Sequence, residues 1–138
     1  MAADKYVGLA WLAYYKGVPV EDLTGWRRTG EVWVPTPDVS IGHEDPRQPR
    51  SPGWSRECVD RWTPGMARFT RPEVVVLAST QMMCDFYGVS VAQLWSQITN
   101  GQGLLAPHAY VDDIPGWLWV DGKPGHDARQ YEGEVSRR

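Results

Sequence analysis

The feature that most constrains the fold is a stretch of the chain that occurs twice. When Gly17 is aligned with Gly88, an offset of 71 positions, apolar and glycine positions on both sides coincide. The coinciding pairs are Ala13 with Cys84, Tyr15 with Phe86, Val18 with Val89, Val20 with Val91, Leu23 with Leu94 and Gly30 with Gly101. These matches indicate an internal duplication, so the chain is expected to fold as two related units.

A second block repeats further along each copy. Pro52-Gly53-Trp54 and Pro115-Gly116-Trp117 match at an offset of 63 positions. This offset is shorter because the first copy carries a longer loop around residues 42–51. Two matching blocks in the same order favour duplication over coincidence.

Each copy predicts two helices joined by a tight turn. The first helix would stop at Gly17 or Gly88, because glycine accepts the positive φ that commonly follows a helix end. The next helix would begin at Ser90, a good N-cap, or at Pro19, which suits a first helical turn. The spacing of the apolar residues then allows the two helices to pack across the turn.

An extended region follows each predicted helix pair, at residues 32–41 and 104–111. The prolines in these regions favour edge strands over central ones. The Pro-Gly-Trp block would return the chain and complete a two-stranded wing. Each copy therefore reads as a winged helix-turn-helix unit.

The predicted fold class is mainly α with small β wings (α+β), with two tandem winged helix-turn-helix units packed as a pseudo-dimer. A chain of 138 residues suits one compact domain or two very small ones. The expected divisions are a first unit over 1–66, a connection over 67–76, a second unit over 77–121 and a polar, flexible tail over 122–138.

The first copy resembles the excisionase and MerR-type family of small winged-helix proteins. The resemblance rests on Gly17-Val18, Trp26-Arg27-Arg28 and Gly53-Trp54-Ser55-Arg56, and the second copy is similar more loosely through Gly88-Val89-Ser90 and Pro115-Gly116-Trp117. It implies cytoplasmic DNA-binding proteins that regulate transcription or direct site-specific recombination. The resemblance further implies that the second helix of each pair enters the major groove.

The residues carried over to the DNA-reading helices come from both copies. They are Pro19, Val20, Thr24, Ser90, Val91, Ala92, Gln93, Trp95, Ser96 and Thr99. This set departs from the expected pattern, because base edges are usually read by Arg, Lys, Asn or Gln. No Lys or Arg lies between Cys84 and Gly101, and Glu21 and Asp22 stand on the first copy's helix.

Basic residues are concentrated in the first half of the chain. The net charge is −3, but residues 1–72 carry ten basic and nine acidic side chains, against four basic and eight acidic in residues 73–138. The predicted phosphate contacts are Arg27, Arg28, Arg47, Arg50, Arg56 and Arg61. The alternative is that these arginines are solvated surface groups paired with neighbouring carboxylates such as Glu57 and Asp60.

Two functions remain open from the sequence. The first is a sequence-specific protein that binds double-stranded DNA, as a transcription regulator or a recombination accessory factor. The second is a protein-interaction module in which the acidic second unit mediates assembly or partner binding. A mixed form, with DNA on the first unit and protein on the second, agrees best with the uneven charge.

Other functional classes have little support in the sequence. No phosphate-binding loop, nucleophile motif or paired-carboxylate helix is present, so we expect neither an enzyme nor a cofactor. Cys58 and Cys84 belong to no metal-binding cluster and are expected to be buried, reduced thiols, which favours the cytoplasm. No apolar run approaches the roughly 20 residues of a membrane-spanning helix.

Overall fold

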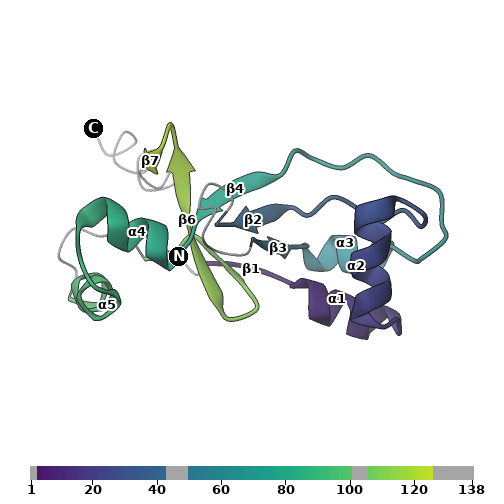
Figure 1. The fold of residues 1–138 in the computed structure, drawn as a ribbon, viewed down its shortest axis with the longest axis horizontal. Coiled ribbons are helices and arrows are strands. Elements are labelled where there is room, and N and C mark those ends of the chain that lie inside the picture. The colour runs from purple at the N-terminus through teal and green to yellow at the C-terminus, as the bar shows by residue number, and fades with distance from the viewer. Residues whose placement is uncertain (1–2, 43–49, 101–105, 126–138) are drawn as a thin grey trace.

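The computed structural model describes residues 3–42, 50–100 and 106–125, and these contain five helices and seven strands. The first half of the chain runs through β1 (Asp4–Tyr6), α1 (Leu9–Lys16), α2 (Val20–Thr29), β2 (Val39–Ile41), β3 (Ser51–Gly53) and α3 (Arg56–Arg61). The second half runs through β4 (Val75–Ala78), α4 (Thr80–Tyr87), α5 (Val91–Thr99), β5 (Ala109–Val111), β6 (Ile114–Val120) and β7 (Lys123–Pro124). The helices of the two halves lie at opposite ends of a central sheet (Figure 1).

The predicted helix pairs are confirmed in both copies. Gly17 and Gly88 end α1 and α4 in the left-handed region, each with φ of 67°. Leu23 and Leu94 are fully buried, so the second helix of each pair packs inward at the same position. Ser90 caps α5 in a reciprocal arrangement with Gln93 that satisfies two backbone N–H groups.

The strands of the two halves are interleaved in one mixed sheet. Its order is β1-β5-β6-β4-β2-β3, with β7 added beside β6. β1 pairs in parallel with β5, and β4 pairs in parallel with β2, so each half gives its first strand to the other half's hairpin. The internal repeat is therefore expressed as an exchange of strands between the two copies.

The sheet is nearly closed into a barrel. Val7 and Trp54 form an isolated antiparallel bridge, which joins the β1 and β3 ends of the strand order. The equivalent pair in the second half, Ala78 and Trp117, lies in the ladder between β4 and β6. If β1 is exchanged with β4, β2 with β5 and β3 with β6, the strands follow one another around the barrel in the same order. This is expected for an internal two-fold relation.

This arrangement shows that the predicted fold class is wrong. The strands are not small wings on two mainly helical units, and the two copies do not pack as separate units in a pseudo-dimer, because their strands hydrogen-bond across the halves. The physical reason is that a hairpin of two short strands leaves backbone N–H and C=O groups unpaired along its edges. The first strand of the other half satisfies those groups.

The predicted edge position of the proline-bearing strands is also wrong. β2 and β5 begin only after Pro37 and Pro107, and each lies between two other strands. The prolines precede the strands, so no ladder hydrogen bond is lost.

The glycine and the tryptophan of each Pro-Gly-Trp block are buried and contribute to packing in the core. A Cβ added to Gly53 would lie 2.5 Å from a Val111 methyl carbon, and one added to Gly116 would lie 2.9 Å from Ile41. Only glycine permits this approach between strands of different halves. Trp54 and Trp117 are buried and fill the two cores between the sheet and the helices.

Candidate nucleic-acid interface

Arg27 lies in the last turn of α2, where a cation interacts favourably with the negative end of the helix dipole. Its guanidinium carbon is 5.2 Å from the centre of the Trp54 ring, within cation–π range. Burial against this region lowers the pKa of Arg27, although the residue as a whole remains exposed. The core of the first half therefore fixes the position of this side chain.

Arg50 approaches the same region from a different element. It directly precedes β3, and both arginines line an open hollow of about 510 Å³ on the outer side of the sheet. The other lining residues are Pro37, Ser40, Pro52, Val74 and Val76. None of these described residues is acidic, so the described lining contains two arginines and no carboxylate.

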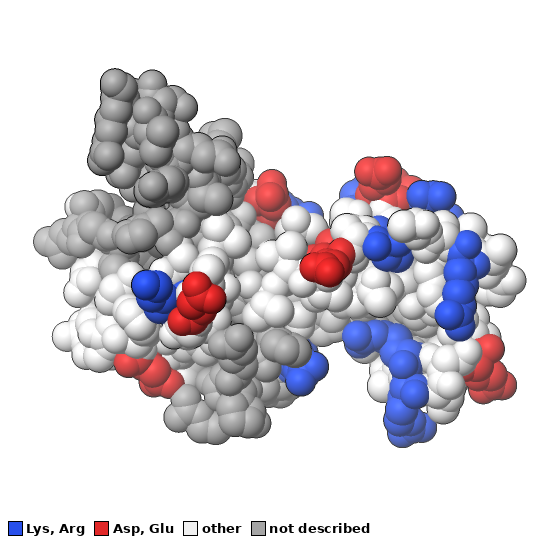
Figure 2. All heavy atoms as spheres, turned by 90° about the horizontal axis from the view of Figure 1, so that it is seen from above, with Lys and Arg blue, Asp and Glu red and all other residues white. Residues whose placement is uncertain are grey.

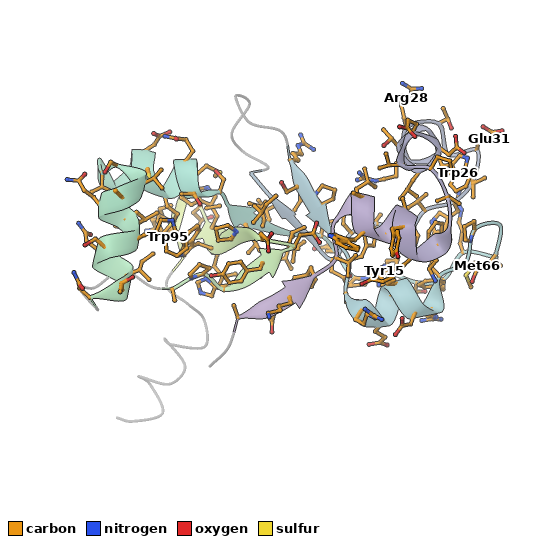
Figure 3. All side chains as sticks on the ribbon, turned by 90° about the horizontal axis from the view of Figure 1, so that it is seen from below. Tyr15, Trp26, Arg28, Glu31, Met66 and Trp95 are labelled. Atoms are coloured by element: carbon orange, nitrogen blue, oxygen red, sulfur yellow. The ribbon has the colours of Figure 1, made fainter. Side chains whose placement is uncertain are left out.

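Basic side chains are concentrated at one end of the molecule. Figure 2 shows Lys and Arg side chains gathered over the first-half end and few over the described part of the other end. Arg28 points away from the body of the protein beside this region (Figure 3). Glu21 and Asp22 occupy the first turn of α2, at the opposite end of the helix from Arg27 and Arg28. The dipole of α2 itself disfavours an anion at the C-terminal end, so any attraction for phosphate there would come from the side chains of Arg27 and Arg28.

Arg56 and Arg61 already have partners within the protein. The Arg56 guanidinium lies 5.0 Å from the centre of the Tyr15 ring and pairs with Asp60 at 3.3 Å. The Arg61 guanidinium lies 4.1 Å from the centre of the Phe69 ring. These contacts agree with the alternative of structural surface arginines, although both residues remain exposed. Arg47 lies outside the described residues.

The residues expected on the DNA-reading helix α5 divide into two groups. Val91, Ala92, Ser96 and Thr99 are exposed, whereas Trp95 is half-buried and packs on Trp117 with ring centres 5.7 Å apart. Figure 3 likewise shows Trp95 turned inward from α5. The Ser90 hydroxyl and the Gln93 side-chain oxygen accept the capping hydrogen bonds. The surface of α5 thus offers few long polar groups for base contacts.

The corresponding residues of the first half lie on the turn and on α2. Pro19, Val20 and Thr24 are all exposed. Pro19 is the N-cap of α2 and makes no side-chain capping hydrogen bond. None of these three lines the hollow with Arg27 and Arg50, so the structure separates the expected base-reading positions from the basic ones.

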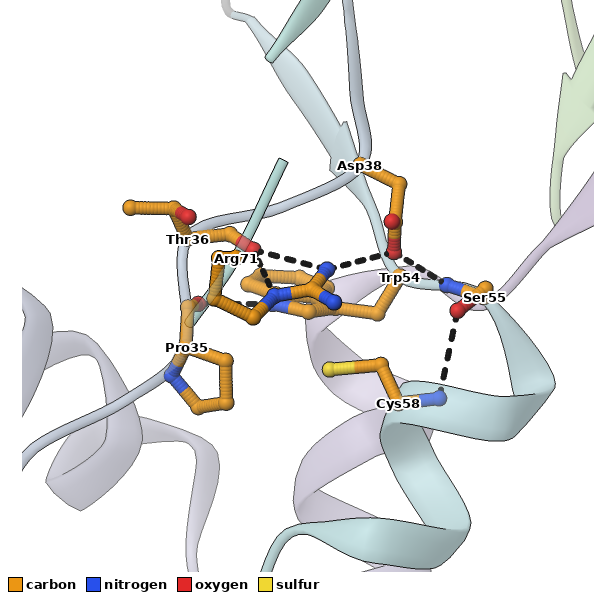
Figure 4. A network of polar contacts seen from close by, with 7 residues as sticks. All are labelled: Pro35, Thr36, Asp38, Trp54, Ser55, Cys58 and Arg71. Carbon is orange, nitrogen blue, oxygen red and sulfur yellow. Dashed lines mark hydrogen bonds and ion pairs between the residues drawn. The ribbon is translucent and has the colours of Figure 1, made fainter. Parts of the chain in front are cut away.

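Arg71, which is not among the site residues expected from the sequence, forms a largely buried ion pair. Arg71 Nη2 lies 2.8 Å from Asp38 Oδ2, and the guanidinium donates two hydrogen bonds to the Thr36 carbonyl (Figure 4). Asp38 also accepts a hydrogen bond from the Ser55 backbone N–H. In the sequence, the one indication of this ion pair is that Asp38 and Arg71 stand shortly before β2 and β4, which pair in parallel.

Next to this ion pair lies Cys58, whose backbone N–H donates to the Ser55 hydroxyl. Burial raises the pKa of the Cys58 and Cys84 thiols, which keeps both in the unreactive protonated form at neutral pH. Both cysteines are free and buried, as predicted. Arg71, Asp38 and Cys58 therefore form a structural network rather than a reactive centre.

Two further findings concern the described part of the chain. It contains no group of three or more His, Cys, Asp or Glu side chains placed to hold a metal ion. None of its helices is long and apolar enough to cross a membrane. No family model, curated protein or solved structure matches this chain.

Proposed function

We propose that the first half of the protein binds double-stranded DNA through phosphate contacts from Arg27, Arg28 and Arg50. The observation that carries the proposal is that Arg27, on α2, and Arg50, directly before β3, line the same hollow. A phosphate bound in this hollow would be attracted by both cations and could accept paired hydrogen bonds from a guanidinium group.

This arrangement favours contacts to the DNA backbone over contacts to base edges. Arg27 is fixed by the Trp54 ring, whereas Arg28 extends outward from the same helix end. Phosphate contacts set affinity and orientation and carry no sequence information directly. Any sequence preference would have to come from the exposed α2 residues Val20 and Thr24. Both roles expected from the sequence, transcription regulation and recombination, begin with such binding.

The proposal is tested by fluorescence anisotropy with a duplex at several salt concentrations. Replacing Arg28 and Arg50 together by Gln should lower affinity at least about tenfold, because a hydrogen bond to a charged group contributes about 1.5–3 kcal/mol. The slope of log affinity against log salt should become shallower by about two, one for each lost phosphate contact. Arg27 is left intact because it also packs on Trp54.

Arg68→Gln is the matched control. Arg68 is exposed, lies between α3 and β4 and does not line the hollow, so its replacement removes one charge without removing a proposed contact. It should leave the salt slope unchanged. An equal loss of DNA affinity in Arg68→Gln and in the double variant would contradict the proposal. So would a wild-type affinity that does not change with salt concentration.

A further inference from the structure

Each half of the protein has a cluster of aromatic rings that includes exposed residues of the first helix of its helix pair. The first aromatic patch consists of Trp11, Tyr14 and Tyr15 on α1, whose ring centres lie 5.5–6.0 Å apart. Tyr14 is 71% exposed, and Tyr15 lies in front of α1 in Figure 3. Such clusters on a protein surface commonly mark interaction sites.

The second aromatic patch consists of Phe86 and Tyr87 on α4 and Trp119 on β6. The Phe86 ring centre lies 5.2 Å from that of Tyr87 and 6.0 Å from that of Trp119. Phe86 is 50% exposed and occupies the position equivalent to Tyr15 in the repeat. The internal repeat relates the two patches at this position only, because Trp11 and Tyr14 align with Met82 and Asp85. The helices that carry the patches lie at opposite ends of the sheet (Figure 1).

The charges beside the two patches are opposite. Lys16 follows the first patch in the last turn of α1, and Arg56 stacks on Tyr15 from α3. Asp85 precedes Phe86 in the second patch. Between positions 73 and 125 the sequence has a single basic residue, Lys123, against five acidic ones. Contact between two first patches would bring Lys16 and Arg56 of the two copies together, whereas contact between a first and a second patch would bring these cations to Asp85.

We infer that the protein associates with itself head to tail, with the first aromatic patch of one copy packed against the second aromatic patch of the next. Such a heterologous contact joins two different surfaces, so each added copy leaves one patch open at each end of the assembly. Rings supply large apolar area, and Tyr hydroxyls and Arg56 supply polar contacts at the rim. The inference does not depend on DNA binding and is tested without nucleic acid.

Sedimentation velocity over a range of concentrations gives the first test. The average mass should rise continuously above the 15.6 kDa of one chain as concentration increases. Tyr14→Ser and Phe86→Ser each remove one exposed ring, so each should weaken association about tenfold, which is the loss typical of a central aromatic at an interface. Ile114→Ser, an exposed apolar residue outside both patches, should leave association unchanged.

Mixing the two variants distinguishes this contact from other modes of association. The Tyr14→Ser copy keeps an intact second patch, and the Phe86→Ser copy keeps an intact first patch. An equimolar mixture should therefore form a dimer at concentrations where each variant alone is monomeric. A wild-type protein that stays monomeric at millimolar concentration would overturn the inference. So would a mixture that stays monomeric, or a dimer lost in only one of the two variants.

Discussion

At the scale of single residues, the ion pair between Asp38 and Arg71 joins the segment before β2 to the segment before β4. Asp38 precedes β2 and Arg71 precedes β4, and the two side chains are only 16% and 13% exposed. The Asp38→Ala substitution leaves the Arg71 charge buried without its partner and removes the acceptor of the Ser55 N–H. We expect a loss of about 3 kcal/mol in the free energy of unfolding, measured by urea denaturation.

Asp60→Ala is the control for this prediction. Asp60 pairs with Arg56 on the surface, where the side chains are 67% and 66% exposed. Its removal should change the free energy of unfolding by no more than about 0.5 kcal/mol, because solvent screens exposed pairs. Similar losses in the two variants would show that the Asp38 pair is not buried in the folded protein.

At the scale of the elements, the turn between the two helices of each pair depends on glycine. Gly88 has φ of 67°, and a Cβ added there would touch nothing within 4 Å. Gly88→Ala should therefore destabilise the protein through backbone strain alone, by about 1 kcal/mol. Gly25 also has space for a Cβ but lies inside α2 with ordinary helical geometry.

Gly25→Ala should consequently have the opposite sign and raise the free energy of unfolding by about 0.5–1 kcal/mol. Thermal or urea unfolding of the two variants provides the measurement. If both alanine variants were equally stable, the left-handed turn after α4 would not be a feature of the folded state.

The helix pairs could be predicted because their determinants are local. The turn glycine, Ser90 as a cap and the buried Leu23 and Leu94 lie within a few residues of one another. The sheet could not be predicted, because most of its strands are too short to show a period of two in the sequence. In addition, strands pair across the halves, as Val39 does with Val75. Spacing within the chain gives no signal for such a partner.

The candidate site was predictable to a similar degree. Arg27, Arg28 and Arg50 were identified from the local excess of positive charge, whereas the convergence of Arg27 and Arg50 on one hollow depends on how the β2–β3 hairpin packs beside α2. The distribution of charge along the sequence can therefore identify arginines as candidates for phosphate contacts. It does not show which of them face solvent on the same surface and which, like Arg56, stack on an aromatic ring.

At the scale of the whole molecule, the exchanged strands make the two halves depend on each other. β1 forms its ladder with β5, and β4 forms a ladder with β2. One buried cluster draws Val39 and Ile41 from the first half and Leu77, Ala109 and Val111 from the second. Neither half can complete this cluster alone, so the two halves share a core at the centre of the molecule.

We therefore expect fragments 1–66 and 67–138 to lack a cooperative unfolding transition alone and to regain one when mixed in equal amounts. Far-UV circular dichroism during thermal unfolding measures both states. Gly53→Val in the first fragment should prevent recovery, because its Cβ would lie 2.5 Å from a Val111 methyl carbon of the other fragment. Val20→Ala, at an exposed position of α2, should permit it. A cooperative transition in fragment 1–66 alone would show that the first half folds without the strand supplied by the second.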